Sequence, residues 1–200
     1  ACITRVGVDI YDAQGCHVHR PIKESELVAD ALERGPYRHY MEKEIHEQPR
    51  AVAETLEERI IAGRVPAEAF GPDAGTIFDS IRAVQIVACG TSYHACLLGA
   101  YYFNQLAGVA AVPVLGPQFI EQYGQSIGPE DVAVFVSQSG ETKDVLNAVK
   151  VMRQRKGQVL GVLNVLGTTL MHQSDVYLPL ASGYEMSVHA TKTVVNQAVR

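Results

Sequence analysis

The chain has 200 residues, 47% of them hydrophobic and 20% charged, which is ordinary for a globular protein with one core and a small appendage. A net charge of −5 argues against nucleic acid as a partner, and no apolar run approaches the roughly 18 residues of a membrane span. The four cysteines have neither CxxC spacing nor the density of a disulfide framework, and no secretion signal is recognisable, so we expect a reduced, cytoplasmic protein.

The first 36 residues predict a β-hairpin followed by a linker. Residues 3–19 have a strand-like pattern that turns at Ala13-Gln14-Gly15. The cysteine and two histidines of the returning strand do not predict a metal site, because neighbouring strand residues point to opposite faces. We therefore assign residues 1–19 to the hairpin and residues 20–36 to a polar linker with one helical turn at Ser25–Leu32.

Residues 37–73 predict two helices and a loop. Apolar side chains recur at helical spacing from Tyr37 to Ile60. Pro49 is expected to divide them, since proline lacks a backbone N–H and disfavours helical backbone in the residue before it. Gly63 is expected to close the second helix.

From residue 74 to residue 200 short apolar runs alternate with helical patterns. Apolar runs bounded by turn residues are typical of strands that are buried on both faces of a parallel sheet. The expected strands are 84–88, 110–115, 132–136, 159–164 and 176–180, and the expected helices are 74–80, 93–106, 116–123, 144–156, 168–173 and one that starts near 187–191. This alternation predicts an α/β fold with a doubly wound, mostly parallel five-stranded sheet, and Pro113 favours an edge position for the second strand.

The segment from Ser137 to Thr142 (SQSGET) is the strongest functional signal. It connects a buried strand to a helix, and ligands of parallel sheets bind beyond the carboxyl ends of the strands. A helix N-terminus presents unpaired N–H groups and a partial positive charge, so it binds anions without a lysine, and Gly140 allows close approach. We interpret this loop as a phosphate cradle that includes Ser137, Gln138, Ser139 and Thr142.

A second loop, Cys89-Gly90-Thr91-Ser92, follows the first strand of the sheet with the same chemistry. Hydroxyls at a helix start often act only as caps, which remains the alternative, but two loops at corresponding strand ends would face one cleft. Neither loop has the GxxxxGK[ST] or the GxGxxG spacing. The pair predicts a site for a small phosphate monoester, in which Cys89 lines the pocket rather than acting as a nucleophile.

Four segments carry a resemblance to a known family: YRHYMEKEIHEQP, ACGTSYHA, SQSGET and, more loosely, GYEMSVHATKT. On these residues, which span 37–193, the chain resembles the sugar isomerase (SIS) domain of the glutamine–fructose-6-phosphate aminotransferases, the isomerising glucosamine-6-phosphate synthases. The resemblance implies a flavodoxin-like SIS domain over 74–200, the first of two, preceded by helices. Residues 1–19 resemble the end of that family's glutaminase domain, so the chain would be part of a larger enzyme.

The resemblance also implies a ligand, fructose 6-phosphate or glucosamine 6-phosphate, and gives the loop residues roles. The phosphate would be held by Ser92, Ser137, Gln138, Ser139 and Thr142. The sugar would lie against Cys89, Gly90 and Thr91, with main-chain contacts from Val188. Ala190 stands where the family has a serine, and His189 replaces a small residue.

The catalytic glutamate, histidine and lysine of the family would lie downstream, and Lys192 is not that lysine. We therefore expect this chain to bind a sugar phosphate without turnover, to need no cofactor or metal, and to form a homodimer. Two alternatives stay open. A regulatory SIS module would have a DNA-binding motif and a basic patch, and a stand-alone aldose–ketose isomerase would need a base such as Glu141 or His94.

Overall fold

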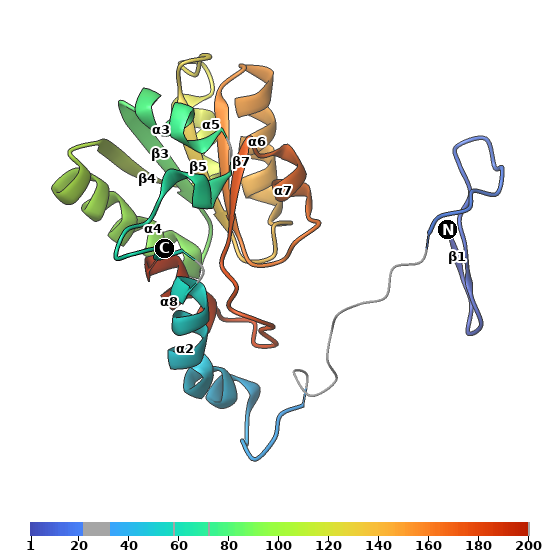
Figure 1. Cartoon of the computed structure of the whole chain (residues 1–200). Coiled ribbons are helices and arrows are strands. Elements are labelled where there is room, and N and C mark those ends of the chain that lie inside the picture. The colour runs from blue at the N-terminus through green and yellow to red at the C-terminus, as the bar shows by residue number, and fades with distance from the viewer. Residues whose placement is uncertain (22–32, 58, 72, 200) are drawn as a thin grey trace. The chain divides into compact units, whose positions relative to one another are not determined.

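The computed structural model describes residues 1–21, 33–57, 59–71 and 73–199 (Figure 1). The chain divides into two compact units, Ala1–Glu33 and Arg34–Arg200. The helical turn expected at Ser25–Leu32 lies outside the described residues. Within the described ranges, none of the helices combines the length and the apolar character that crossing a membrane requires.

The first unit contains an antiparallel hairpin that turns earlier than predicted. Strand β1 (Cys2–Ile3) pairs with β2 (Val8–Asp9). Between them the Thr4 hydroxyl accepts the N–H of Gly7 at 3.1 Å, and such local side-chain bonds compete with an extended strand. The turn predicted at Ala13-Gln14-Gly15 is present as a second turn, where the Asp12 carboxylate accepts two backbone N–H groups.

Helix α2 (Tyr40–Glu57) is one helix, so the predicted break at Pro49 is wrong. A proline inside a helix costs about 3 kcal/mol, and tertiary contacts along α2 offset this. α2 packs against α8 (Lys192–Val199), from which the buried Asn196 amide donates two hydrogen bonds to α2. The helix ends before Gly63, which lies instead in a turn with φ +76°.

Five parallel strands form the sheet of the second unit in the order β4-β3-β5-β6-β7. Their bounds are β3 (Ala83–Ala88), β4 (Ala110–Leu115), β5 (Val132–Ser137), β6 (Gln158–Leu163) and β7 (Val176–Pro179). The predicted doubly wound parallel sheet is confirmed, with β4 at an edge as Pro113 indicated. The direction of winding reverses at β3 and β5, and this reversal is where ligands of such sheets bind.

Helices cover both faces of the sheet (Figure 1). On one face α4 (Thr91–Tyr102) packs through Cys96 and Ala100 against β3 and β5. On the other face α5 (Gly116–Tyr123) and α6 (Lys143–Gln154) enclose Phe119 and Phe135, and full burial of such a side chain contributes about 1.5–3 kcal/mol. The remaining elements are η1 (Ala67–Phe70), α3 (Ala74–Ser80), the π-helical turn η2 (Phe103–Ala107) and α7 (Thr169–Gln173).

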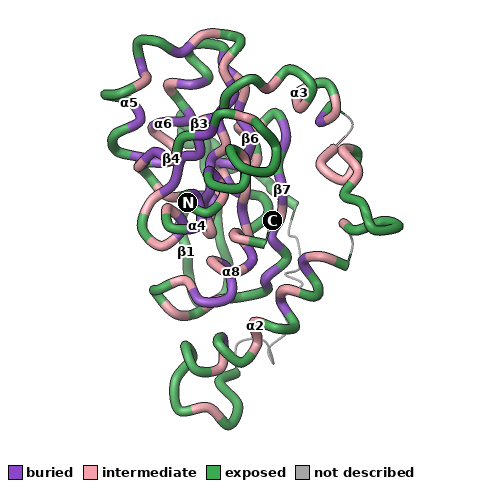
Figure 2. The backbone as a smooth tube through the Cα atoms, turned by 90° about the vertical axis from the view of Figure 1, so that its left-hand side faces the viewer, coloured by how far each residue is buried: buried purple, intermediate pink, exposed green. Residues whose placement is uncertain are grey.

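Buried residues concentrate in the strands and on the inner sides of the helices (Figure 2). Ala88 at the end of β3 pairs with Val136 near the end of β5. The loops that follow these two strands therefore begin side by side, with Cys89 beside Ser137.

Candidate functional site

A polar hollow of about 270 Å³ lies at the carboxyl ends of β3 and β5. Such a volume is just below the range of about 300–1,000 Å³ for drug-sized ligands, so it suits a small molecule. The lining residues are Cys89, Gly90, Thr91, Ser92, Gln138, Ser139, Thr142, Glu185, Ser187, Val188 and Ala190. The structure thus brings together every predicted site residue except Ser137.

Ser137 is buried, and its hydroxyl bonds within its own loop. The hydroxyl lies 2.8 Å from that of Thr142 and accepts the N–H of Gly140 at 3.1 Å. Gly140 has φ +65°, and a Cβ there would lie 2.1 Å from Oγ1 of Thr168. The backbone conformation of the cradle is therefore held by Ser137 from within the loop and limited by Thr168 from outside it.

The hydroxyls of the two loops do not cap the helices that follow them. Thr142 precedes α6 but makes no cap bond, because its hydroxyl contacts Ser137, and Gly90 before α4 has no side chain. The first-turn N–H groups of both helices are thus left without a side-chain cap at the hollow. Among the described residues that line it, none carries a positive charge, so positive potential comes from two helix N-termini.

Ser92 and Ser139 contribute hydroxyls whose hydrogens are free to point at a ligand. The Ser92 hydroxyl accepts a hydrogen bond from Nε2 of Gln197 at 3.0 Å, and the Ser139 hydroxyl accepts the N–H of Glu141 at 3.2 Å. A hydroxyl that accepts in this way retains its own hydrogen, so each can donate to a phosphate oxygen.

The Cys89 thiol is poorly suited to act as a nucleophile. Burial raises its pKa, which the Gly116 N–H lowers in part and the negative charge of Asp144 raises again. A thiol with a raised pKa remains protonated at neutral pH, and the thiolate is the reactive form. Cys89 therefore acts as a small lining residue.

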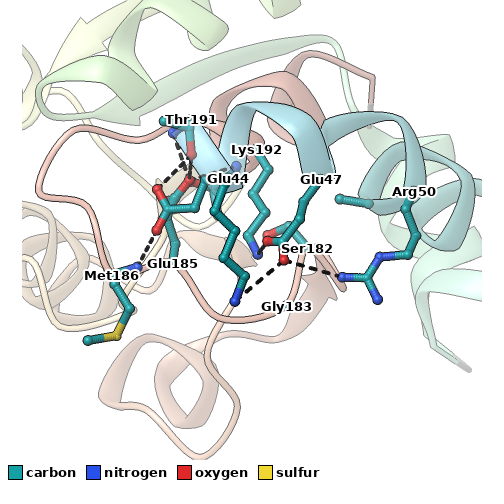
Figure 3. Close-up of polar contacts among 12 residues, drawn as sticks. Glu44, Glu47, Arg50, Ser182, Gly183, Glu185, Met186, Thr191 and Lys192 are labelled. Carbon is teal, nitrogen blue, oxygen red and sulfur yellow. Dashed lines mark hydrogen bonds and ion pairs between the residues drawn. The ribbon is translucent and has the colours of Figure 1, made fainter. Parts of the chain in front are cut away.

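Glu185 and Ser187 were not predicted, and they belong to a segment that connects β7 to α8. The Glu185 carboxylate accepts the N–H and the hydroxyl of Thr191, both at 2.7 Å, together with groups of Thr193 (Figure 3). Its charge is thus engaged by the first residues of α8. The signal in the sequence is a glutamate shortly before a predicted helix start, and a glutamate in a solvated loop gives the same signal.

Glu44 of α2 also holds this segment. It is 2% exposed and accepts the N–H groups of Met186 at 2.6 Å and Ser187 at 3.0 Å. Burial by itself raises the pKa of Glu44, but hydrogen bonds from Ser187 and Met186 outweigh it, so the pKa lies below its ordinary value.

The other titratable candidates lie outside the hollow. Lys192 is buried and donates to Glu47 at 2.7 Å (Figure 3). Glu141 accepts the N–H of Thr169 at 2.6 Å, and His94 and His189 are exposed. Across the described part of the chain, no three His, Cys, Asp or Glu side chains are grouped as metal ligands would be.

A second hollow, of about 340 Å³, lies against the α4 face of the sheet. Its lining is almost entirely apolar and includes Phe70, Phe78, Val134 and Leu160. Its lining, as far as the structure describes it, has no cationic side chain and only Tyr177 and Gln197 as polar donors besides the Cys96 thiol, so the smaller polar hollow is the candidate site.

Comparison with known proteins identifies the family to which this fold belongs. The sequence profile of the SIS domain matches residues 77–200. The chain belongs to the SIS domain family. This confirms the family resemblance of the sequence motifs.

Among curated proteins, the chain is similar to enzymes named glutamine–fructose-6-phosphate aminotransferase (isomerising). It is 40% identical over 198 residues to that of Vibrio vulnificus and 38% identical over 198 residues to that of Yersinia pestis. Each match covers 98% of this SIS chain but 32% of the relative, so the chain spans about a third of the length of these relatives.

Among solved structures, the chain is similar to the C-terminal domain of glucosamine-fructose-6-phosphate aminotransferase from Francisella tularensis. The TM-score is 0.79 at 30% identity, and the match covers 84% of this chain and 47% of that one. The SIS fold of this chain is thus shared with a domain of an aminotransferase.

Proposed function

We propose that the hollow binds fructose 6-phosphate or glucosamine 6-phosphate. The observation that carries the proposal is that two uncapped helix N-termini and their hydroxyl-bearing loops converge on one small cavity. The similarity to aminotransferases named for fructose 6-phosphate supports the choice of sugar.

In this proposal the phosphate lies between the two loops. The hydroxyls of Ser92, Ser139 and Thr142 donate to its oxygens, and the N–H groups of α4 and α6 stabilise its charge. Ser137 contributes by holding the cradle in shape. The sugar extends toward Cys89, Thr91 and the segment that contains Val188 and Ala190.

We further propose that the parent protein converts fructose 6-phosphate and glutamine to glucosamine 6-phosphate and glutamate, and that this chain alone does not turn over. Moving a hydrogen between the first two sugar carbons needs an acid–base group within hydrogen-bond reach. The candidates of a stand-alone isomerase, Glu141 and His94, do not line the hollow, and the Glu185 carboxylate is occupied by the start of α8.

The proposal includes a cytoplasmic homodimer. The cysteines Cys2, Cys16, Cys89 and Cys96 are free thiols, as expected of a reducing compartment. The outer side of α4 and η2 exposes large apolar side chains, which marks an interaction surface. These side chains are Leu97, Leu98, Tyr101, Tyr102 and Leu106.

Calorimetric titration tests the function directly. The chain should bind fructose 6-phosphate and glucosamine 6-phosphate more tightly than inorganic phosphate, and it should bind unphosphorylated fructose weakly. Incubation with fructose 6-phosphate and either glutamine or ammonia should yield no glucosamine 6-phosphate. Absence of sugar-phosphate binding would refute the site, and clear turnover would favour the stand-alone isomerase.

A further inference from the structure

The segment Ser182–Thr191, here called the strap, forms one wall of the hollow without regular secondary structure. Glu185, Ser187, Val188 and Ala190 line the cavity from this strap. A side wall made of irregular backbone keeps its shape only if its polar groups are bonded to fixed elements.

The strap is attached at its first end to the sheet. The Asn164 side chain, just after β6, accepts the N–H of Ser182 at 3.0 Å and donates to the carbonyl of Gly183 at 2.7 Å. These contacts fix the point at which the strap leaves the sheet, but they do not reach its lining residues.

The middle of the strap is held by Glu44, which lies on α2 and does not line the hollow. One oxygen of its carboxylate accepts the N–H groups of Met186 and Ser187, at 2.6 and 3.0 Å (Figure 3). The other oxygen lies 3.1 Å from the Thr191 hydroxyl. Glu44 thus reaches both the middle of the strap and its end.

Thr191 connects the Glu44 carboxylate of α2 with the Glu185 carboxylate of the strap itself. Its hydroxyl lies 3.1 Å from Glu44 and 2.7 Å from Glu185, and the residue is 8% exposed. A hydroxyl has one hydrogen, so it donates to one carboxylate at a time and ties the two positions together.

The phosphate loop from Ser137 to Thr142 is supported independently of these contacts. Ser137, Thr142 and Gly140 bond to one another, and the Gly140 carbonyl accepts the N–H of Leu170 at 3.1 Å. None of these contacts includes a residue of the strap. Loss of the Glu44 contacts should therefore affect the sugar wall and spare the phosphate cradle.

We propose that Glu44 is a positioning residue for sugar recognition. From α2 it fixes the backbone of Met186 and Ser187 so that the strap fits the sugar. Thr191 links it to the Glu185 carboxylate. This inference rests on the proposed function and adds to it a residue that touches no ligand. It places control of sugar affinity in a helix outside the sheet.

The test compares two ligands, fructose 6-phosphate and inorganic phosphate, on five variants and the parent. Glu44→Ala should weaken fructose 6-phosphate binding at least about ten-fold, because two strap N–H groups lose a charged acceptor. Glu44→Gln should stay within about three-fold of the parent, since its amide oxygen still accepts both N–H groups. Inorganic phosphate should bind the parent and both variants alike. Glu54→Ala, an exposed position on the same helix, is the matched control.

If Glu44→Ala does not fold, a comparison of Thr191→Val with Thr191→Ser tests the inference instead. The valine variant deletes the linking hydroxyl and should weaken fructose 6-phosphate binding but not phosphate binding, and the serine variant should restore it. A parallel loss for both ligands, or no change in either despite a fully folded variant, overturns the inference while the proposed function stands. If the unsubstituted chain binds phosphate but no sugar phosphate, the proposed function is overturned, and this inference with it.

Discussion

Hydroxyl groups of similar sequence context have two different structural roles in this site. Ser137 bonds to Thr142 and Gly140 and shapes the cradle, whereas Ser92 and Ser139 keep hydrogens available at the hollow, as Thr142 does when it accepts the hydrogen of Ser137. The sequence pattern predicts that hydroxyls gather at the strand ends. It does not separate the two roles, because both depend on the curve of the loop rather than on spacing.

Substitution of Ser139 tests the ligand-facing role. Ser139→Ala removes one hydrogen bond to a charged oxygen, which contributes about 1.5–3 kcal/mol, so affinity for fructose 6-phosphate should fall roughly 10- to 150-fold. Titration calorimetry measures the change, with Ser126→Ala, an exposed serine in another loop, as the control. Equal affinity of Ser139→Ala and the parent would show that this hydroxyl does not contact the phosphate.

Glu44 predicts a pH dependence of stability. Its pKa is lowered from 4.5 in the folded protein, so its charged form stabilises the fold above about that pH, and this contribution is lost as pH falls through the lower folded pKa. Glu44→Gln should cost about 1–3 kcal/mol of unfolding free energy at pH 7 and progressively less below about pH 4.5. Urea unfolding of the two proteins between pH 3.5 and 8 measures this. A difference that stays constant down to pH 3.5 would contradict it.

At the scale of elements, the sheet was predictable and the strap was not. Apolar runs bounded by turn residues are a local signal, so all five strands and the helices between them were found near their observed bounds. The contact between Glu44 and Met186 joins residues 142 positions apart, and no local pattern encodes it. The same long-range packing explains why α2 continues through Pro49.

The loop before α6 requires glycine at position 140. Gly140→Ala would place a Cβ 2.1 Å from Oγ1 of Thr168 at a backbone φ of +65°, which strains the cradle from both causes. We expect a loss of about 1–3 kcal/mol in unfolding free energy and weaker binding of both phosphate and sugar phosphate. Gly128→Ala is the matched control, because its nearest contact would be at 3.8 Å. Unchanged phosphate affinity in Gly140→Ala would contradict the cradle.

At the scale of the whole molecule, the candidate site belongs to one of the two units. Every lining residue, and Glu44 with its partners, lies within Arg34–Arg200. A shortened chain of residues 34–200 should bind fructose 6-phosphate within about two-fold of the full chain, because no contact of the site is lost. A chain that also lacks α2 should bind far more weakly, since the strap loses Glu44. Titration and thermal unfolding of both chains check this, and a large loss on removing residues 1–33 would contradict it.

The apolar outer surface of α4 carries the last prediction, that two copies of the chain associate. Tyr101 is 61% exposed and lies three residues after Leu98, on the same side of α4, and Leu106 in the η2 turn that follows is 81% exposed. A helix that is apolar on both sides is normally covered on both, and a second copy of the same surface would provide the cover. We expect sedimentation equilibrium to show a dimer and Tyr101→Glu with Leu106→Glu to give a folded monomer.

The control for this prediction is Leu166→Glu, which introduces the same charge at a position that is 61% exposed but lies in the loop after β6. This variant should remain dimeric, because Leu166 is not part of the apolar surface of α4 and η2. Fructose 6-phosphate affinity should be unchanged in the monomer, since no α4 residue beyond Ser92 lines the hollow. An unsubstituted chain that sediments as a monomer at about tens of micromolar would show that the copies do not associate. A double variant that still dimerises would show that the contact between copies lies elsewhere.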